Sequence, residues 1–131
     1  MSYVIDTSVI VPASLTGRWP RSLARFALAA PTLLWSEAAS ALKQLEWRGE
    51  IDADQAERAV SWLQKAGVES HDSRELILSA WQVAKALGWA KTYDAEYIVL
   101  AQGLSVPLLT FDARLQRAAG HLVEIRGPTE A

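Results

Sequence analysis

The chain has 131 residues, half of them hydrophobic, and a net charge of −2 from 13 basic and 15 acidic residues. This composition predicts a single domain over residues 1–131, with a real core and a loose tail after about residue 127. The near-neutral charge excludes a protein that coats nucleic acid by electrostatics alone. The lack of cysteine in the sequence excludes disulfides, thiolate metal sites and cysteine nucleophiles.

Short apolar runs and helical patterns alternate along the chain. In chain order the prediction is strand 4–5, helix 7–13, helix 21–30, strand 32–35, helix 36–48, helix 53–65, strand 68–70, helix 73–87, helix 92–102, strand 106–110, helix 112–119 and strand 122–125. Pro31 and Gly49 end two of these helices, and Asp52 with Gln55 resembles a capping box that begins another. The alternation predicts an α/β fold built from parallel βαβ units with right-handed crossovers.

The N-terminus does not resemble a signal peptide, because no basic region precedes its first apolar run and Asp6 interrupts that run. No stretch approaches the roughly 20 apolar residues that a membrane-spanning helix needs. We therefore expect a cytoplasmic protein that does not contact membranes.

Four carboxylates lie at the ends of hydrophobic segments, namely Asp6, Glu37, Asp94 and Asp112. In an open parallel sheet the functional crevice lies outside the carboxyl ends of the strands. Three of these acids follow a predicted strand, and Asp94 begins a predicted helix, so all four can gather at one edge. A cluster of hard oxygen ligands is the chemistry that holds Mg²⁺ or Mn²⁺, and such clusters commonly carry out phosphodiester or phosphoryl chemistry.

Each acid also has an ordinary explanation when taken alone. Asp6 and Asp112 fit helix N-caps, and Glu37 fits the first turn of a helix, where the macrodipole favours an acid. Glu96, two residues after Asp94, is expected to face elsewhere on its helix. A phosphatase of the haloacid dehalogenase type also places Asp after its first strand. That chemistry needs a second Asp two residues later, where this chain has Ser8.

Four motifs occur together in a fixed order: VIDTSV at residues 4–9, SEA at 36–38, TYDA at 92–95 and LTFDARL at 109–115. This ordered set resembles the PIN-domain nucleases and is most similar to the toxin component of VapBC-type toxin–antitoxin modules. The resemblance extends from Tyr3 to about Ile125. It implies a three-layer α/β/α fold with a parallel sheet in the order 3-2-1-4-5.

The resemblance also implies the residues of the site. The catalytic acids would be Asp6, Glu37, Asp94 and Asp112. Of these, Asp6, Asp94 and Asp112 would bind metal, and Glu37 would bind an ion or position the attacking water. The supporting hydroxyls would be Thr7 or Ser8, and Thr110. Apart from the resemblance, Arg114, which follows Asp112 closely, and Lys91, near the predicted edge, are the candidate RNA contacts.

The activity that the resemblance implies is that of a Mg²⁺- or Mn²⁺-dependent endoribonuclease. The partners would be RNA, a second copy in a homodimer, and a VapB-type antitoxin that buries the site. Helix 53–65, Trp47 and Trp62 are candidate partner surfaces, and core packing explains them equally well. Two alternatives stay open: a PIN-domain nuclease that processes RNA outside a toxin module, and a PIN module that binds without catalysis.

Overall fold

The computed structural model describes residues 2–131. The strands are β1 (Ser2–Ile5), β2 (Ala27–Pro31), β3 (Val68–His71), β4 (Leu108–Leu109) and β5 (Ile125–Arg126). The α-helices are α1 (Thr7–Thr16), α2 (Leu33–Trp47), α3 (Ala53–Lys65), α4 (Ser73–Leu87), α5 (Tyr93–Leu104) and α6 (Ala113–Ala119), and a 3₁₀ helix, η1, spans Pro128–Glu130.

The strands form one parallel sheet in the order β3-β2-β1-β4-β5, which confirms the predicted order. The register on either side of the central strand β1 is fixed by the pairs Val4 with Ala29 and Val4 with Leu108. All three of these residues are buried. Because the strands are parallel, the carboxyl ends of β1 and β4 open onto the same edge, where α1 and α6 begin.

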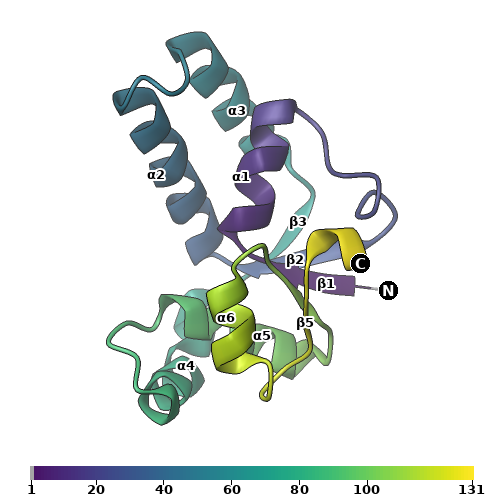
Figure 1. Ribbon diagram of the computed structural model, residues 1–131, viewed down its shortest axis with the longest axis vertical. Coiled ribbons are helices and arrows are strands. Elements are labelled where there is room, and N and C mark those ends of the chain that lie inside the picture. The colour runs from purple at the N-terminus through teal and green to yellow at the C-terminus, as the bar shows by residue number, and fades with distance from the viewer. Residues whose placement is uncertain (1) are drawn as a thin grey trace.

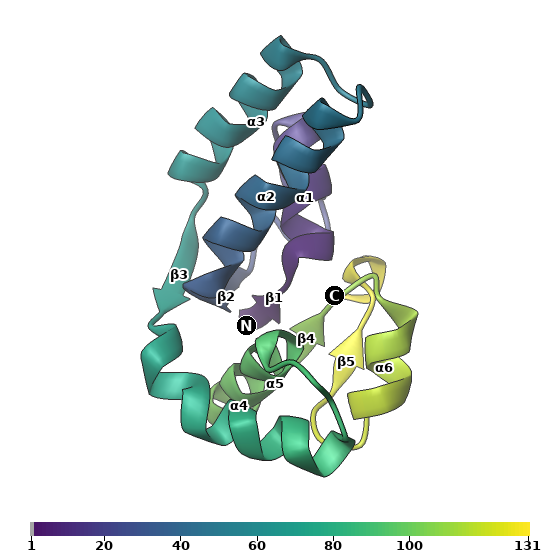
Figure 2. The ribbon, with the colours of Figure 1, turned by 90° about the vertical axis from the view of Figure 1, so that its left-hand side faces the viewer.

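Helices cover both faces of the sheet, as the three-layer prediction required. Figures 1 and 2 show α1, α2 and α3 on one face and α4, α5 and α6 on the other. Helix α5 lies against β1, β2 and β4 as well as α4, and its residues 95–101 are all buried. Within residues 2–131 we find no helix with both the length and the apolar character to cross a bilayer.

The predictions of a helix at residues 21–30 and a strand at 32–35 are wrong. Ala27–Pro31 forms β2, and α2 begins at Leu33. A short apolar run fits a helix or a strand equally well by periodicity, and here pairing with β1 and β3 decides the outcome. As a result, Glu37 lies inside α2, more than one turn from its start, and does not directly follow a strand.

Two smaller predictions also need correction. Helix α1 does not end near Pro12 but continues to Thr16, because Ile10 and Ala13 are buried in the core and Gly17 provides the left-handed turn that ends it, with φ of 76°. The tail that we expected to be loose forms η1 at Pro128–Glu130. Pro128 is buried, and its carbonyl accepts a hydrogen bond of 2.9 Å from the hydroxyl of Ser22. This bond holds the turn in place.

Candidate active site

Asp6 stands at the end of β1 and caps the start of α1. Its Oδ1 accepts hydrogen bonds from the backbone N–H of Ser8 at 3.0 Å and from the Ser8 hydroxyl, and its Oδ2 accepts one from the Thr110 hydroxyl. The side chain is 8% exposed. Burial raises the pKa of Asp6 and nearby Asp94 adds to this rise, whereas the hydrogen bonds from Ser8 and Thr110 act against it.

Ser8 and Thr110 connect the end of β1 to the segment between β4 and α6. Thr110 is fully buried, and its Oγ1 also accepts the backbone N–H of Asp112 at 3.0 Å. The Ser8 hydroxyl accepts the N–H of Phe111 at 2.9 Å. Thr7, the third predicted hydroxyl, forms no side-chain hydrogen bond with any part of the chain that the structure describes. The hydroxyl support of Asp6 therefore comes from Ser8 and Thr110.

Glu37 reaches the site from α2 and is about half buried. Its Oε1 accepts a hydrogen bond of 2.7 Å from the hydroxyl of Tyr97 on α5. Burial raises the pKa of Glu37, and the charges of Asp94, Asp6 and Glu96 raise it further, while the Tyr97 bond acts against the rise. These electrostatic effects mean that Asp6, Glu37 and Asp94 lie near one another, although they come from three different elements.

Asp94 and Asp112 are joined through Arg114. Nη2 of Arg114 lies 3.2 Å from Oδ2 of Asp94 and 3.3 Å from Oδ2 of Asp112. Asp112 also caps α6, because its Oδ1 accepts the N–H groups of Arg114 and Leu115. Contacts thus connect three of the four predicted acids, with Thr110 linking Asp112 to Asp6 and Arg114 linking Asp112 to Asp94.

Two residues of this region were missed in the sequence. Tyr97 lies three residues after Asp94, a spacing that places both on one face of a helix, and this was the available signal. Glu96, which we expected to face elsewhere, is 5% exposed and raises the pKa of both Glu37 and Tyr97. Its Oε1 is buried and has no hydrogen-bond partner among residues 2–131. Glu96 is therefore buried close to Glu37 but does not line the cavity that Asp94 lines.

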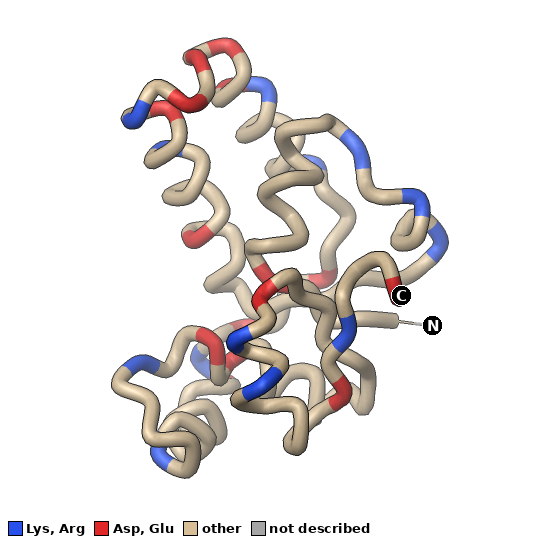
Figure 3. Tube along the Cα trace, viewed as in Figure 1, with Lys and Arg blue, Asp and Glu red and all other residues tan. Residues whose placement is uncertain are grey.

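A cavity of about 480 Å³ opens beside the acids. Its lining includes Glu37 and Asp94 together with Lys91 and Arg114, the two predicted RNA contacts. Figure 3 shows acidic segments near the centre of the molecule, between the helices on one face of the sheet and those on the other. The cavity combines carboxylates with two basic side chains, as a site for a metal ion and a phosphate requires.

The donor set fits a hard divalent ion in its chemistry, because it offers carboxylate oxygens and no sulfur. As the side chains lie, no three acidic or histidine groups of residues 2–131 are close enough to hold an ion. The hydroxyls of Thr110 and Tyr97 hold Asp6 and Glu37, whereas the guanidinium of Arg114 engages Asp94 and Asp112. The carboxylates therefore fit a metal ion if Arg114 withdraws and the acids move closer together.

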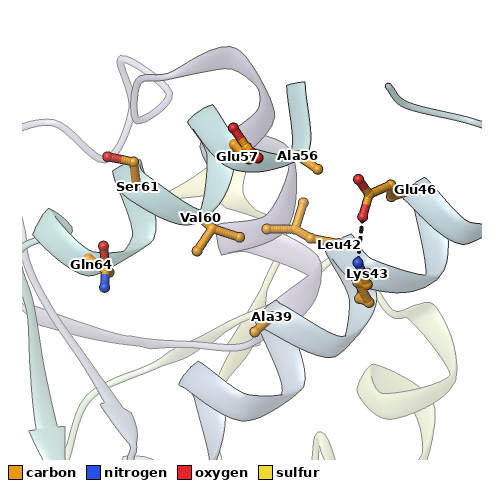
Figure 4. A pocket seen from close by; sticks show the side chains of 9 residues that line it. All are labelled: Ala39, Leu42, Lys43, Glu46, Ala56, Glu57, Val60, Ser61 and Gln64. Carbon is orange, nitrogen blue, oxygen red and sulfur yellow. Dashed lines mark hydrogen bonds and ion pairs between the residues drawn. The ribbon is translucent and has the colours of Figure 1, made fainter. Parts of the chain in front are cut away.

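A second cavity, of about 330 Å³, lies between α2 and α3, away from the acids. In Figure 4 the side chains of Leu42 and Val60 extend between the two helices, and Lys43 pairs with Glu46 at 2.8 Å on the rim. None of the predicted site residues lines it. This cavity therefore takes no part in the chemistry of the acids.

The family model of the PIN domain matches residues 3–121 of the chain. The chain belongs to the PIN-domain family. Ribonuclease VapC1 of Mycobacterium tuberculosis is 35% identical over 130 residues, which cover 94% of this chain and 95% of that protein. Ribonuclease VapC9 of the same organism is 33% identical over 113 residues, covering 86% and 87%. Within the PIN-domain family the chain therefore groups with the VapC ribonucleases.

Solved structures agree with this fold. The structure of PAE2754 from Pyrobaculum aerophilum superposes with a TM-score of 0.70 at 24% identity, covering 90% of this chain and 87% of that one. The structure of VapBC2 from Rickettsia felis, bound to a DNA fragment from its promoter, has a TM-score of 0.68 at 15% identity, covering 97% and 98%. At these identities the likeness concerns the fold alone.

Proposed function

We propose that this PIN-domain protein is a Mg²⁺- or Mn²⁺-dependent endoribonuclease and the toxin of a type II toxin–antitoxin module. The observation that carries the proposal is the meeting of Asp6, Glu37 and Asp94 at the carboxyl edge of the sheet, where the charge of Asp94 adds to the rise in the pKa of Asp6 and of Glu37. Carboxylates that repel one another in this way attract a divalent cation. Membership among the VapC ribonucleases supports RNA as the substrate.

In the proposed mechanism Asp6 and Asp94 would hold the principal ion, and Asp112 would hold a second ion or a bridging water. A bound divalent ion would supply a water that loses its proton near neutral pH. Glu37 would bind an ion or position the attacking water, and Tyr97 fixes the orientation of Glu37 through the 2.7 Å bond. Ser8 and Thr110 hold the Asp6 carboxylate in place.

Lys91 and Arg114 would bind phosphates of the RNA beside the scissile bond. Both line the cavity that contains Glu37 and Asp94, so a phosphate that reached the acids would pass close to these cations. We assign no hydroxyl support to Thr7, because the hydrogen bonds to Asp6 come from Ser8 and Thr110.

We propose a VapB-type antitoxin and a second copy of the chain as partners, in the cytoplasm where the RNA is. Two solved structures similar in fold are described as VapBC2 from Rickettsia felis and VapBC-1 from nontypeable Haemophilus influenzae. Exposed apolar side chains support protein partners: Trp47 is 85% exposed, and on α4 Leu78 and Trp81 are 70% and 67% exposed. Trp62 instead packs edge-on against Trp19, with ring centroids 5.0 Å apart.

The test is cleavage of total cellular RNA by purified, antitoxin-free protein with Mg²⁺, with Mn²⁺ and with a chelator. We expect discrete products that require metal and disappear with the chelator. Absence of cleavage by folded protein under every metal condition would favour a PIN module that binds without catalysis. Cleavage by a protein that does not arrest growth when expressed without its neighbouring genes would favour RNA processing outside a toxin module.

A further inference from the structure

Arg114 is the basic side chain that pairs with acids of the candidate site. Nη2 of Arg114 lies within 3.3 Å of carboxylate oxygens from both Asp94 and Asp112. Asp94 belongs to the first turn of α5, whereas Asp112 caps α6, so a single nitrogen joins two elements. Among residues 2–131 no other basic side chain pairs with any of the four acids.

The pairing with Arg114 partly neutralises the negative charges of Asp94 and Asp112. Arg114 donates hydrogen bonds to Oδ2 of Asp94 and to Oδ2 of Asp112. The helix cap at α6 is made by the other oxygen of Asp112, Oδ1. The guanidinium stays protonated at any working pH, and its neighbours raise its pKa further, the hydrogen bond to Asp112 most of all. In the absence of metal, Arg114 therefore provides a positive charge between Asp94 and Asp112, two of the proposed metal ligands.

The same contacts are easily broken. The Arg114 side chain is 65% exposed, and those of Asp94 and Asp112 are 41% and 36% exposed. Ion pairs with this much exposure are weak, because water solvates both partners and the long side chain gains freedom when it leaves. A divalent ion carries twice the charge of the guanidinium and binds carboxylate oxygens directly.

We propose that Arg114 is a built-in counter-ion of the metal-free site, and that divalent metal displaces its guanidinium when it binds at these acids, first of all at Asp94. This inference rests on the proposed function, because it takes those acids as metal ligands. The displaced guanidinium remains at the cavity that Lys91 also lines, where the phosphate of a substrate would meet it. Metal binding thus releases the cation that contacts RNA, so the two binding events are coupled through one side chain.

Arg117 provides a matched control. It lies on the same helix, three residues from Arg114, is exposed, and forms no ion pair or side-chain hydrogen bond with residues 2–131. Arg114→Gln and Arg117→Gln remove the same charge from nearly the same place. A difference in Mn²⁺ affinity between the two variants therefore reports the contact of Arg114 with Asp94 and Asp112, and not the change in the net charge of the protein.

The experiment is a calorimetric titration of each purified protein with Mn²⁺ alone, without RNA. We expect Arg114→Gln to bind Mn²⁺ about two- to fivefold more tightly than the wild type, and Arg117→Gln to change the affinity by less. Thermal unfolding gives a second readout: Arg114→Gln should lower Tm in chelator, and the difference should disappear in saturating Mn²⁺.

Equal or weaker Mn²⁺ binding by Arg114→Gln, with the wild type binding normally, would overturn this inference and leave the proposed function intact. A tighter affinity of equal size in both variants would also overturn it, because the effect would then be one of net charge. A folded wild-type protein that binds no Mn²⁺ would overturn the proposed function and this inference with it.

Discussion

Tyr97 donates a hydrogen bond of 2.7 Å to Oε1 of Glu37, and this bond joins α5 to α2 at the candidate site. The tyrosine is 2% exposed, and its pKa is raised, first by burial and then by the bond to Glu37, so the hydroxyl keeps its proton. Because Tyr97 lies one turn after Asp94, a single buried helix both presents one acid and orients another. The position of Glu37 therefore depends on α5 as much as on α2.

Replacing Tyr97 with Phe should weaken both the fold and the reaction. The change leaves the Glu37 oxygen without its donor, which we expect to cost about 1–2 kcal/mol in the free energy of unfolding, measured by urea titration. With Glu37 no longer fixed, kcat for RNA cleavage should fall about tenfold while KM changes little.

Tyr93→Phe is the matched control for this prediction, because Tyr93 lies on the same helix and is 50% exposed. It should leave both the free energy of unfolding and kcat near the wild-type values. Equal effects of the two substitutions would contradict the role assigned to the Glu37–Tyr97 bond.

Asp6→Asn should abolish cleavage and leave the fold intact. Asn caps helices as well as Asp does, so α1 keeps its start, while the site loses one of the negative charges that attract a divalent ion. RNA cleavage and circular dichroism measure the two properties separately. Asp72→Asn makes the same change at the cap of α4 and should retain full activity.

Thr110→Val should test the buried hydroxyl that links the ends of β1 and β4. The Thr110 hydroxyl donates to Asp6 and accepts the N–H of Asp112, and the residue is fully buried. Because Val has nearly the same shape, the substitution leaves these groups unpaired without creating a cavity. We expect a loss of about 1–3 kcal/mol in the free energy of unfolding and weaker Mn²⁺ binding. A variant as stable as the wild type would show that water replaces the hydroxyl.

The metal-free protein should become less stable as pH rises through the range in which its buried acids ionise. The pKa values of Asp6 and Glu37 are raised, mainly by burial, so the folded state keeps protons that the unfolded chain has already released. Stability therefore begins to fall near the ordinary carboxylate pKa of about 4 and levels off above the raised values.

Urea unfolding in chelator at a series of pH values measures this effect. The stability of Asp6→Asn relative to wild type should increase as pH rises, because the variant has no charge to bury. Saturating Mg²⁺ should remove the trend, since a bound cation favours the ionised carboxylates. A difference between the two proteins that does not vary with pH would contradict the raised pKa of Asp6.

The order of the sheet could be predicted because four short motifs occur in the order typical of the PIN-domain nucleases, and the resemblance to that family implies the strand order. The boundary between β2 and α2 could not. Residues 21–30 are apolar at helical spacing, yet Ala27–Pro31 pairs with strands on both sides, and this long-range pairing overrides local pattern. Glu37 lines the same cavity as Asp94, although its expected place just after a strand was wrong.

The contacts between the residues of the site could be predicted from the sequence less well than the residues themselves. The sequence shows that Asp112 precedes Arg114 by two residues, but only the fold brings Asp94 to the same guanidinium. Similarly, the hydrogen bond between Tyr97 and Glu37 depends on how α2 and α5 pack. Glu96 is buried with the rest of residues 95–101, because this part of α5 packs in the interior of the fold. Partners across elements follow from packing, which a pattern along one chain does not contain.

The measurement that tests the metal site most directly is a crystal structure of the antitoxin-free protein grown with Mn²⁺, with the ion located by its anomalous scattering. We predict an ion bound directly by carboxylate oxygens of Asp6 and Asp94, with the Arg114 guanidinium withdrawn from Asp94. A fully occupied Mn²⁺ site elsewhere on the molecule, or an empty pocket in saturating Mn²⁺ with Arg114 still between Asp94 and Asp112, would contradict the assignment of these acids as metal ligands.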